Sequence, residues 1–119
     1  MHRTMDTSEE RRQFRREPFH SNVHVIVESS GLHAVGNALD ISPGGFRLLC
    51  SEPLPVGEVA LLKFQIKTGR KVRTEETRGR VRRVQMDDDV WVIGLEFIAV
   101  LDRRKTPLLV HAATRWNHT

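Results

Sequence analysis

The sequence has no tyrosine, a single cysteine and no long apolar run. One thiol, that of Cys50, excludes an internal disulfide and predicts a reducing, cytoplasmic setting. No apolar stretch approaches the length of a membrane span, so we expect no insertion into a membrane. The first residues are polar, which argues against a secretory signal. At 119 residues the chain is long enough for one domain with a modest core.

Charge and composition define the class of protein and of partner. With 39% hydrophobic and 29% charged residues, the chain is typical of a globular domain and not of a disordered one. The formal net charge is +4 and the pI is about 10.0. This excess favours an anionic partner, such as a nucleic acid, a nucleotide, an acidic protein or a lipid head group, without choosing among them.

The apolar pattern predicts an all-β domain with a terminal helix. Apolar residues alternate over six short segments, at about residues 23–27, 33–39, 46–50, 62–66, 72–84 and 91–97. Residues 40–45 are predicted to form a turn. Thr106-Pro107 then predicts the start of a helix. Short antiparallel strands favour a six-stranded barrel, because closure removes exposed strand edges. We expect a flexible arginine-rich arm over residues 1–20 and the barrel with its C-terminal α-helix over residues 21–119.

The N-terminal arm carries four arginines and no lysine, namely Arg11, Arg12, Arg15 and Arg16. A guanidinium group is planar and always protonated, so it can bind a phosphate through two bonds, contact guanine O6 and N7, or stack on a purine. Clustering without lysine therefore favours planar recognition. The alternative is a solvated basic tail that neighbouring glutamates partly neutralise.

A second short segment, Asp40–Gly45, reads Asp-Ile-Ser-Pro-Gly-Gly. The carboxylate of Asp40 can accept from both donors on the Watson–Crick edge of guanine, and the Ser42 hydroxyl can donate to a phosphate. The glycines allow positive φ angles and a close approach of backbone N–H groups to an anion. The alternative is a structural β-turn in which Asp40 bonds its own backbone.

The order of these segments resembles the PilZ domain family, which binds the bacterial second messenger cyclic di-GMP. The likeness spans about residues 9–116. It is carried by an Arg-Arg-x-x-x-Arg motif, an Asp-x-Ser-x-x-Gly motif and two late strands (Arg11, Arg12, Arg16; Asp40, Ser42, Gly45; 79–81; 92–97). The family's fold is a six-stranded antiparallel barrel with a flanking C-terminal helix, as the apolar pattern also predicts.

The resemblance implies roles for individual residues. Arg12 and Arg16 would clasp guanine and phosphate groups, and Asp40 would pair with a guanine edge. Ser42 and Gly45 would line the same pocket. An arginine at the position of Arg11 accompanies an intercalated pair of ligand molecules in this family, which implies two ligands per domain.

The implied function is that of a non-enzymatic receptor. The ligand would order the arm onto the barrel and change the surface shown to an unidentified downstream protein. No cofactor besides the ligand, no metal and no nucleic acid is expected. The sequence leaves two alternatives open. One is a nucleic-acid-binding barrel of the OB or cold-shock kind, supported by the basic stretch 67–83, although that stretch lacks aromatic residues for base stacking. The other is a degenerate PilZ domain that acts only through protein contacts.

Overall fold

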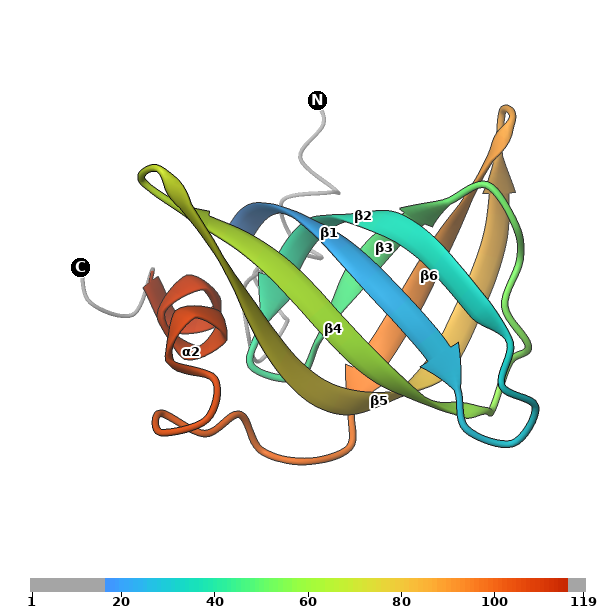
Figure 1. Cartoon of the computed structure of the whole chain (residues 1–119). Coiled ribbons are helices and arrows are strands. Elements are labelled where there is room, and N and C mark those ends of the chain that lie inside the picture. The colour runs from blue at the N-terminus through green and yellow to red at the C-terminus, as the bar shows by residue number, and fades with distance from the viewer. Residues whose placement is uncertain (1–16, 116–119) are drawn as a thin grey trace, which may run out of the picture.

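Six antiparallel strands form a closed barrel in the computed structural model, which describes residues 17–115 (Figure 1). The strands follow the order β1-β2-β3-β6-β5-β4 around the barrel. A single helix, α2, follows the last strand. The bounds are β1 (Glu17–Val27), β2 (His33–Ser42), β3 (Gly45–Cys50), β4 (Val59–Thr68), β5 (Lys71–Asp87), β6 (Val90–Phe97) and α2 (Pro107–Thr114). This architecture confirms the predicted fold class. No helix within the described range is long and apolar enough to cross a membrane.

The barrel is filled by the side chains that alternate inward along each strand. Three phenylalanines form its centre: the ring centroids of Phe46 and Phe64 lie 4.8 Å apart, and those of Phe46 and Phe97 lie 5.7 Å apart. Cys50 is buried in the same core, as expected for a small apolar side chain. The interior is therefore packed with side chains, and any ligand must bind outside it.

The observed strands extend beyond several of the predicted boundaries, and two of these extensions affect the candidate site. β1 begins at Glu17, four residues before the predicted start of the barrel at residue 21. β2 runs on to Ser42, so the residues from Asp40 to Ser42 belong to a strand and not to the predicted turn. Only Pro43 and Gly44 connect β2 to β3, because Ser42 is paired with Gly45. Asp40, Ser42 and Gly45 therefore lie on paired backbone.

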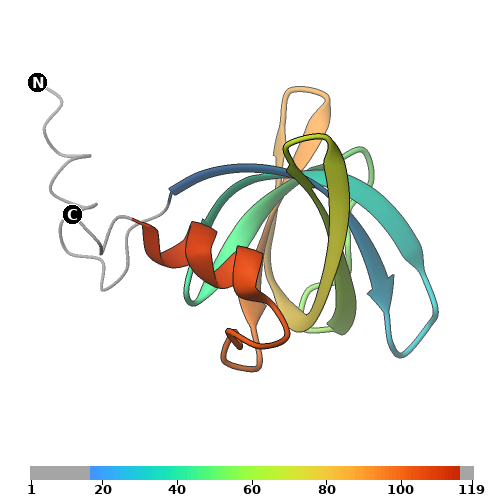
Figure 2. The same cartoon turned by 60° about the vertical axis from the view of Figure 1, so that its left-hand side comes forward.

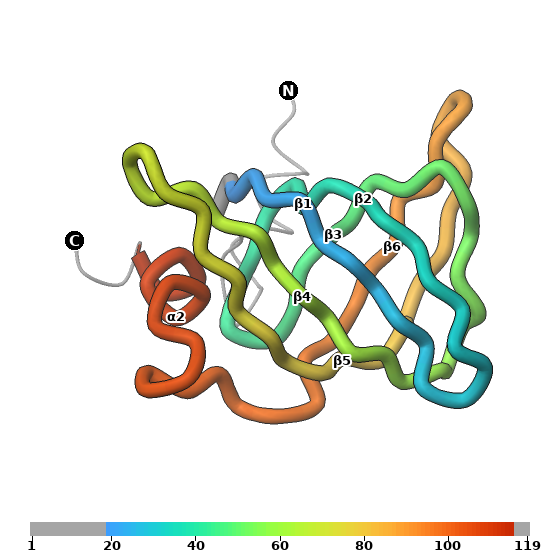
Figure 3. The backbone as a smooth tube through the Cα atoms, in the orientation of Figure 1, coloured from blue at the N-terminus to red at the C-terminus, as the bar shows by residue number. Residues whose placement is uncertain are grey.

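α2 lies against one end of the barrel, beside the β4–β5 hairpin, and Figure 2 shows it across that end. We call this the helix end; Figure 3 shows the β5–β6 hairpin at the opposite end. The helix buries Leu109, Ala112 and Ala113 against the core. Its apolar spacing confirms the predicted helical segment.

A carboxylate from the barrel caps the N-terminus of α2. The backbone N–H groups of Leu108 and Leu109 donate to the two carboxylate oxygens of Glu75 on β5, at 3.0 and 2.9 Å. Thr106 precedes the helix as predicted, but its hydroxyl bonds to the backbone of Asp102 instead of capping. The first turn of a helix has unsatisfied N–H groups and a partial positive charge, so a buried carboxylate stabilises it strongly. Glu75 thereby fixes the position of the helix on the barrel.

Replacing this cap should destabilise the domain. Glu75→Gln keeps one oxygen acceptor but loses the charge and the second bond, and we expect it to lower the free energy of unfolding by about 1–3 kcal/mol. Urea denaturation measures the change. The matched control is Glu76→Gln, the exposed neighbour that makes only a long ion pair with Lys63 (3.9 Å); it should change the stability by less than about 0.5 kcal/mol. Equal effects of the two substitutions would contradict the capping role.

Candidate ligand-binding site

A β-bulge in β2 decides which way Asp40 faces. Residues Ala34, Gly36 and Ala38 of β2 face the core, and simple alternation would send Asp40 inward after them. The register shifts instead: Ala38 is paired with Leu48, and Asp40 with Arg47. Two steps along β2 therefore match one step along β3, which makes Leu39 the extra residue. Ile41 then returns to the core. Asp40, although buried, is paired with the exposed Arg47 and so faces the outer side of the barrel.

The carboxylate of Asp40 is held by an arginine on the neighbouring strand. The Arg47 side chain donates to Oδ2 of Asp40 from Nε at 2.8 Å and from Nη2 at 2.6 Å. The Asp40 side chain is 9% exposed and that of Arg47 is 48% exposed. A charge-assisted contact of this kind is short and directional. It fixes the carboxylate on the outer face of the β2–β3 hairpin.

The outer face continues from Arg47 toward a second arginine. Arg47 on β3 is paired with Gly94 on β6, and Gly94 is paired with Arg83 on β5. Arg83 is exposed. A Cβ atom at Gly94 would meet only the Cβ of Arg83 at 3.6 Å, an ordinary contact, so packing does not require glycine there. Two arginines thus flank a position without a side chain, on the same face as Asp40.

Ser42 holds the turn that follows. Its hydroxyl accepts from the Gly44 N–H at 3.3 Å, and the hydroxyl lies 3.4 Å from the Gly45 carbonyl oxygen. Serine in the first position, proline in the second and glycine in the fourth are typical of a type I turn. Neither Gly44 nor Gly45 has a positive φ angle, so the backbone freedom expected of them is not used.

Gly45 is required for a different reason. A Cβ atom there would lie 2.1 Å from the carbonyl oxygen of Leu95 on β6. The backbones of β3 and β6 therefore approach too closely for any side chain. At Gly44 the same construction meets nothing within 4 Å. Of the two adjacent glycines, only Gly45 is fixed by the packing of the barrel.

The structure brings Asp40, Ser42 and Gly45 together around one hairpin. Arg11, Arg12 and Arg16 lie outside the described residues. Arg47 and Arg83 were not selected from the sequence. The sequence does contain a signal for Arg47. If Pro43 and Gly44 form a two-residue hairpin turn, the flanking residues pair in sequence outward from the turn, and residue 40 lies opposite residue 47. The pairing of Arg83 depends on a further bulge, between Val81 and Arg83. No local sequence pattern predicts this bulge.

Histidines supply no metal centre in the described part of the chain. His24 and His33 approach each other across β1 and β2, with Nδ1 of the first 3.0 Å from Nε2 of the second. Between residues 17 and 115, no group of three or more His, Cys, Asp or Glu side chains is arranged to hold a metal ion.

Comparison with known families matches residues 10–111 to the PilZ domain. The match covers most of the chain. The chain belongs to the PilZ domain family. A comparison of the sequence with proteins of curated function finds no significant match. The PilZ family is a family of cyclic di-GMP receptors, whose domains act by binding and as adaptors. The assignment replaces the alternative of an OB or cold-shock barrel.

Solved structures support the fold. The Bacillus subtilis inhibitor of motility MotI (DgrA) superposes with a TM-score of 0.68 at 22% identity, over 91% of this chain and 52% of that one. The chain therefore spans about half the length of MotI. The PilZ domain of Escherichia coli YcgR with c-di-GMP gives 0.65 at 11% identity, over 91% and 95% of the two chains. The PilZ domain of CeSA from a cellulose-synthesizing bacterium gives 0.58 at 14% identity, over 87% and 98%.

The two adjacent glycines of the turn provide a test of the packing argument. Gly45→Ala should lower the free energy of unfolding by about 2–3 kcal/mol or prevent folding, because its methyl group meets a backbone oxygen. Gly44→Ala should change it by less than about 0.5 kcal/mol. Thermal and urea unfolding of the two variants measure the difference. A Gly45→Ala variant as stable as the parent would show that β3 and β6 are not in this register.

Proposed function

We propose that this PilZ domain is a cyclic di-GMP receptor and adaptor. The dinucleotide binds outside the barrel, between the arginines of the N-terminal arm and the β2–β3 hairpin. Binding orders the arm against the barrel and changes the surface that the domain presents to a protein partner. The domain carries out no chemical step, so the consequence of binding is a change of shape and charge.

One observation carries the proposal: the carboxylate of Asp40 stands on the outer face of the hairpin, held from one side by Arg47. An ionised carboxylate only accepts hydrogen bonds, and a guanine edge offers the two donors N1–H and N2–H, so the two groups are complementary. Arg47 donates to Oδ2 from two nitrogens and so fixes the direction of the carboxylate. The ion pair keeps the carboxylate oriented while a base edge approaches.

The start of β1 brings the arm to this hairpin. Glu17 is paired with Ile41, and Pro18 with Asp40. Arg16 is joined directly to Glu17, and Arg12 precedes Glu17 by five residues. A chain spans at most about 3.6 Å per residue, so these two arginines are tethered within roughly 4 and 18 Å of Glu17. Both can reach a dinucleotide that is bound at Asp40.

Arg47 and Arg83 extend the cationic side of the proposed site. With Gly94 between them, a phosphate or the flat face of a base can lie on the strand backbone and contact either guanidinium group. Each good bidentate contact between arginine and guanine contributes about 1–3 kcal/mol. Two or three of them, less the cost of ordering the arm, support binding near the micromolar range, which needs roughly 8 kcal/mol.

Titration calorimetry with cyclic di-GMP tests the proposal. The parent chain should bind saturably, and Asp40→Asn and Arg12→Ala should each raise Kd by roughly 5- to 150-fold, the equivalent of about 1–3 kcal/mol. Asp87→Asn, on the hairpin at the opposite end, is the control and should bind as the parent does. GTP and single-stranded DNA are the competing ligands. Tighter binding to DNA, or no loss in the two site variants, would overturn the proposal.

The number of ligands depends on Arg11. We expect the parent to bind two molecules of cyclic di-GMP per chain, because a further guanidinium group can stack on or bridge an intercalated pair of purines. Arg11→Ala should lower the calorimetric stoichiometry from about two to about one while binding persists. A parent stoichiometry of one would reject this role of Arg11 and leave the receptor assignment intact.

A further inference from the structure

Between residues 17 and 115, twelve of the fourteen lysines and arginines fall into two groups. The other two are Arg80, which donates to the Gly57 carbonyl, and Arg83, which is exposed on β5. One group is paired with carboxylates: Arg47 with Asp40, Lys63 with Glu76, Arg78 with Glu28, and Arg82 with Glu96. The hydrogen bond that Arg78 donates lowers the pKa of Glu28. Paired cations are already neutralised and attract a partner weakly.

The second group surrounds the helix end. Eight cations come from the end of β4, the start of β5, the loop before α2 and the end of α2 (Lys67, Arg70, Lys71, Arg73, Arg103, Arg104, Lys105, Arg115). Among residues 17–115, no ion pair joins any of them to a carboxylate. The nearby Glu75 is buried as the helix cap, and Asp102 accepts a backbone N–H. Counting only the described residues, the helix end therefore carries a concentrated positive charge that no carboxylate pairs with.

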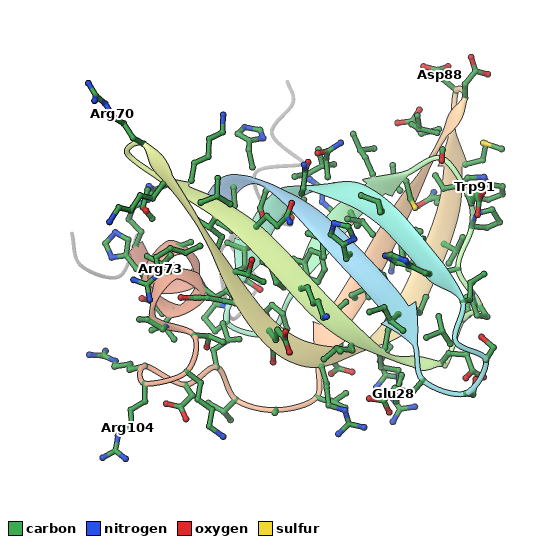
Figure 4. All side chains as sticks on the ribbon, in the orientation of Figure 1. Glu28, Arg70, Arg73, Asp88, Trp91 and Arg104 are labelled. Carbon is green, nitrogen blue, oxygen red and sulfur yellow. The ribbon has the colours of Figure 1, made fainter. Side chains whose placement is uncertain are left out.

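The labelled side chains in Figure 4 show this separation of charge. Arg70, Arg73 and Arg104 lie at the end of the molecule that holds α2, whereas Asp88 and Glu28 lie at the other end. Asp88 belongs to a run of three aspartates on the β5–β6 hairpin. The electrostatic field of the domain is therefore asymmetric. It steers an anionic partner that approaches by diffusion toward α2.

Between these cations lies a groove with an apolar floor. It has a volume of about 740 Å³ and is formed by β1, β2, β4, β5 and α2. Apolar side chains from four elements line it (Phe19 on β1, Ile66 on β4, Val72 on β5, Leu108 and Ala112 on α2). Val72 is 59% exposed, and exposing this much of an apolar residue to water is unfavourable. The other nine lining residues are polar or charged (His20, Ser21, Asn22, Asn37, Gln65, Lys67, Thr68, His111, Arg115).

A smaller hollow of about 210 Å³ lies along α2, lined by Arg103, Pro107, Val110, His111 and Thr114. His111 lines both hollows, so the helix presents grooves on two of its sides. The two hydrogen bonds that the first turn of α2 donates to the Glu75 carboxylate hold the helix in place before any partner binds. A preformed surface costs less ordering entropy on binding than a mobile one.

We infer that the helix end is a docking surface for an acidic protein segment that carries apolar side chains, with carboxylates on the cationic rim and the apolar side chains in the groove beside α2. The apolar floor distinguishes this partner from nucleic acid. A phosphate backbone has nothing to place on Val72 and Leu108, and base stacking needs aromatic rings that the segment from Lys67 to Arg83 lacks.

The inference rests on the proposed function only in assuming that the partner is a protein. The surface differs in its residues from the one proposed for the dinucleotide: none of Asp40, Arg47 and Arg83 lines the groove, although both surfaces use β2 and β5. Binding at the two places can therefore be measured separately on the same protein.

Fluorescence anisotropy with a labelled peptide tests the inference on the full chain. The probe is an acidic peptide of about twelve residues, with glutamates on one helical face and leucines at every third or fourth position. It should bind saturably. Replacing its leucines by serine, or its glutamates by glutamine, should each weaken binding by about tenfold or more, because the first removes the apolar contacts and the second the charge complementarity.

Two variants and one control locate the peptide. Arg73→Glu combined with Arg103→Glu should raise the peptide Kd by about tenfold or more. Val72→Ser should raise it by a few-fold, because Val72 is exposed and its loss does not disturb the core. Arg78→Glu makes a charge reversal at the far end and should leave peptide binding unchanged. Circular dichroism and cyclic di-GMP titration on each variant report whether the fold and the other site are intact.

Three results would overturn the inference: no saturable peptide binding, an equal loss in Arg78→Glu, or tighter binding to a single-stranded oligonucleotide or to phosphatidylglycerol vesicles than to the peptide. A peptide that binds to a chain unable to bind cyclic di-GMP would support the docking surface and count against the receptor function. The reverse pattern would retain the receptor function and reject this surface.

Discussion

The one extra residue in β2, Leu39, is the constraint on which the proposed site depends. Without it, the alternation that places Ala34, Gly36 and Ala38 in the core would put a carboxylate there as well. A buried, unpaired carboxylate is costly, so that arrangement would destabilise the barrel. With the bulge, Asp40 faces Arg47 on the outer side of the sheet and Ile41 fills the interior. The same local change thus protects the core and creates an outward-facing acceptor.

The motif Asp-x-Ser-x-x-Gly is best understood as strand, turn and strand. Asp40 and Ser42 are two residues apart on paired backbone, and Ser42 closes the two-residue turn through its hydroxyl. Gly45 then begins β3 where the backbone of β6 approaches closely. Each spacing has a mechanical reason apart from any ligand. Loss of binding after a change at Gly45 would therefore report on the fold, whereas a change at Asp40 bears on the ligand.

The alternation of apolar residues along the chain predicts the strands, because it depends only on neighbouring residues. Alternation along Leu62, Phe64 and Ile66 and from Trp91 to Phe97 gave strands that the structure contains. The sequence does not predict the features that depend on the register between neighbouring strands. Asp40 was assigned to a turn because proline and glycine follow it, and a bulge leaves no mark in a single strand. The partners of Asp40 and of the α2 N-terminus come from other strands, Arg47 on β3 and Glu75 on β5. Arg47 can be found only by counting outward from a two-residue turn, and Glu75 only from the three-dimensional structure.

The two proposed surfaces meet at the beginning of β1. Pro18 is paired with Asp40, while Phe19, His20 and Asn22 line the groove beside α2. A ligand can change partner affinity only through a difference in contacts between the free and bound states. On the proposed mechanism, a dinucleotide that holds Arg12 and Arg16 restrains the start of β1, and Phe19 and His20 of that strand line the groove. The groove floor itself, on β4 and α2, is held by the barrel and by Glu75. Coupling between the sites is therefore confined to the rim formed by the first residues of β1, and its size is limited by how much of the partner rests on that rim.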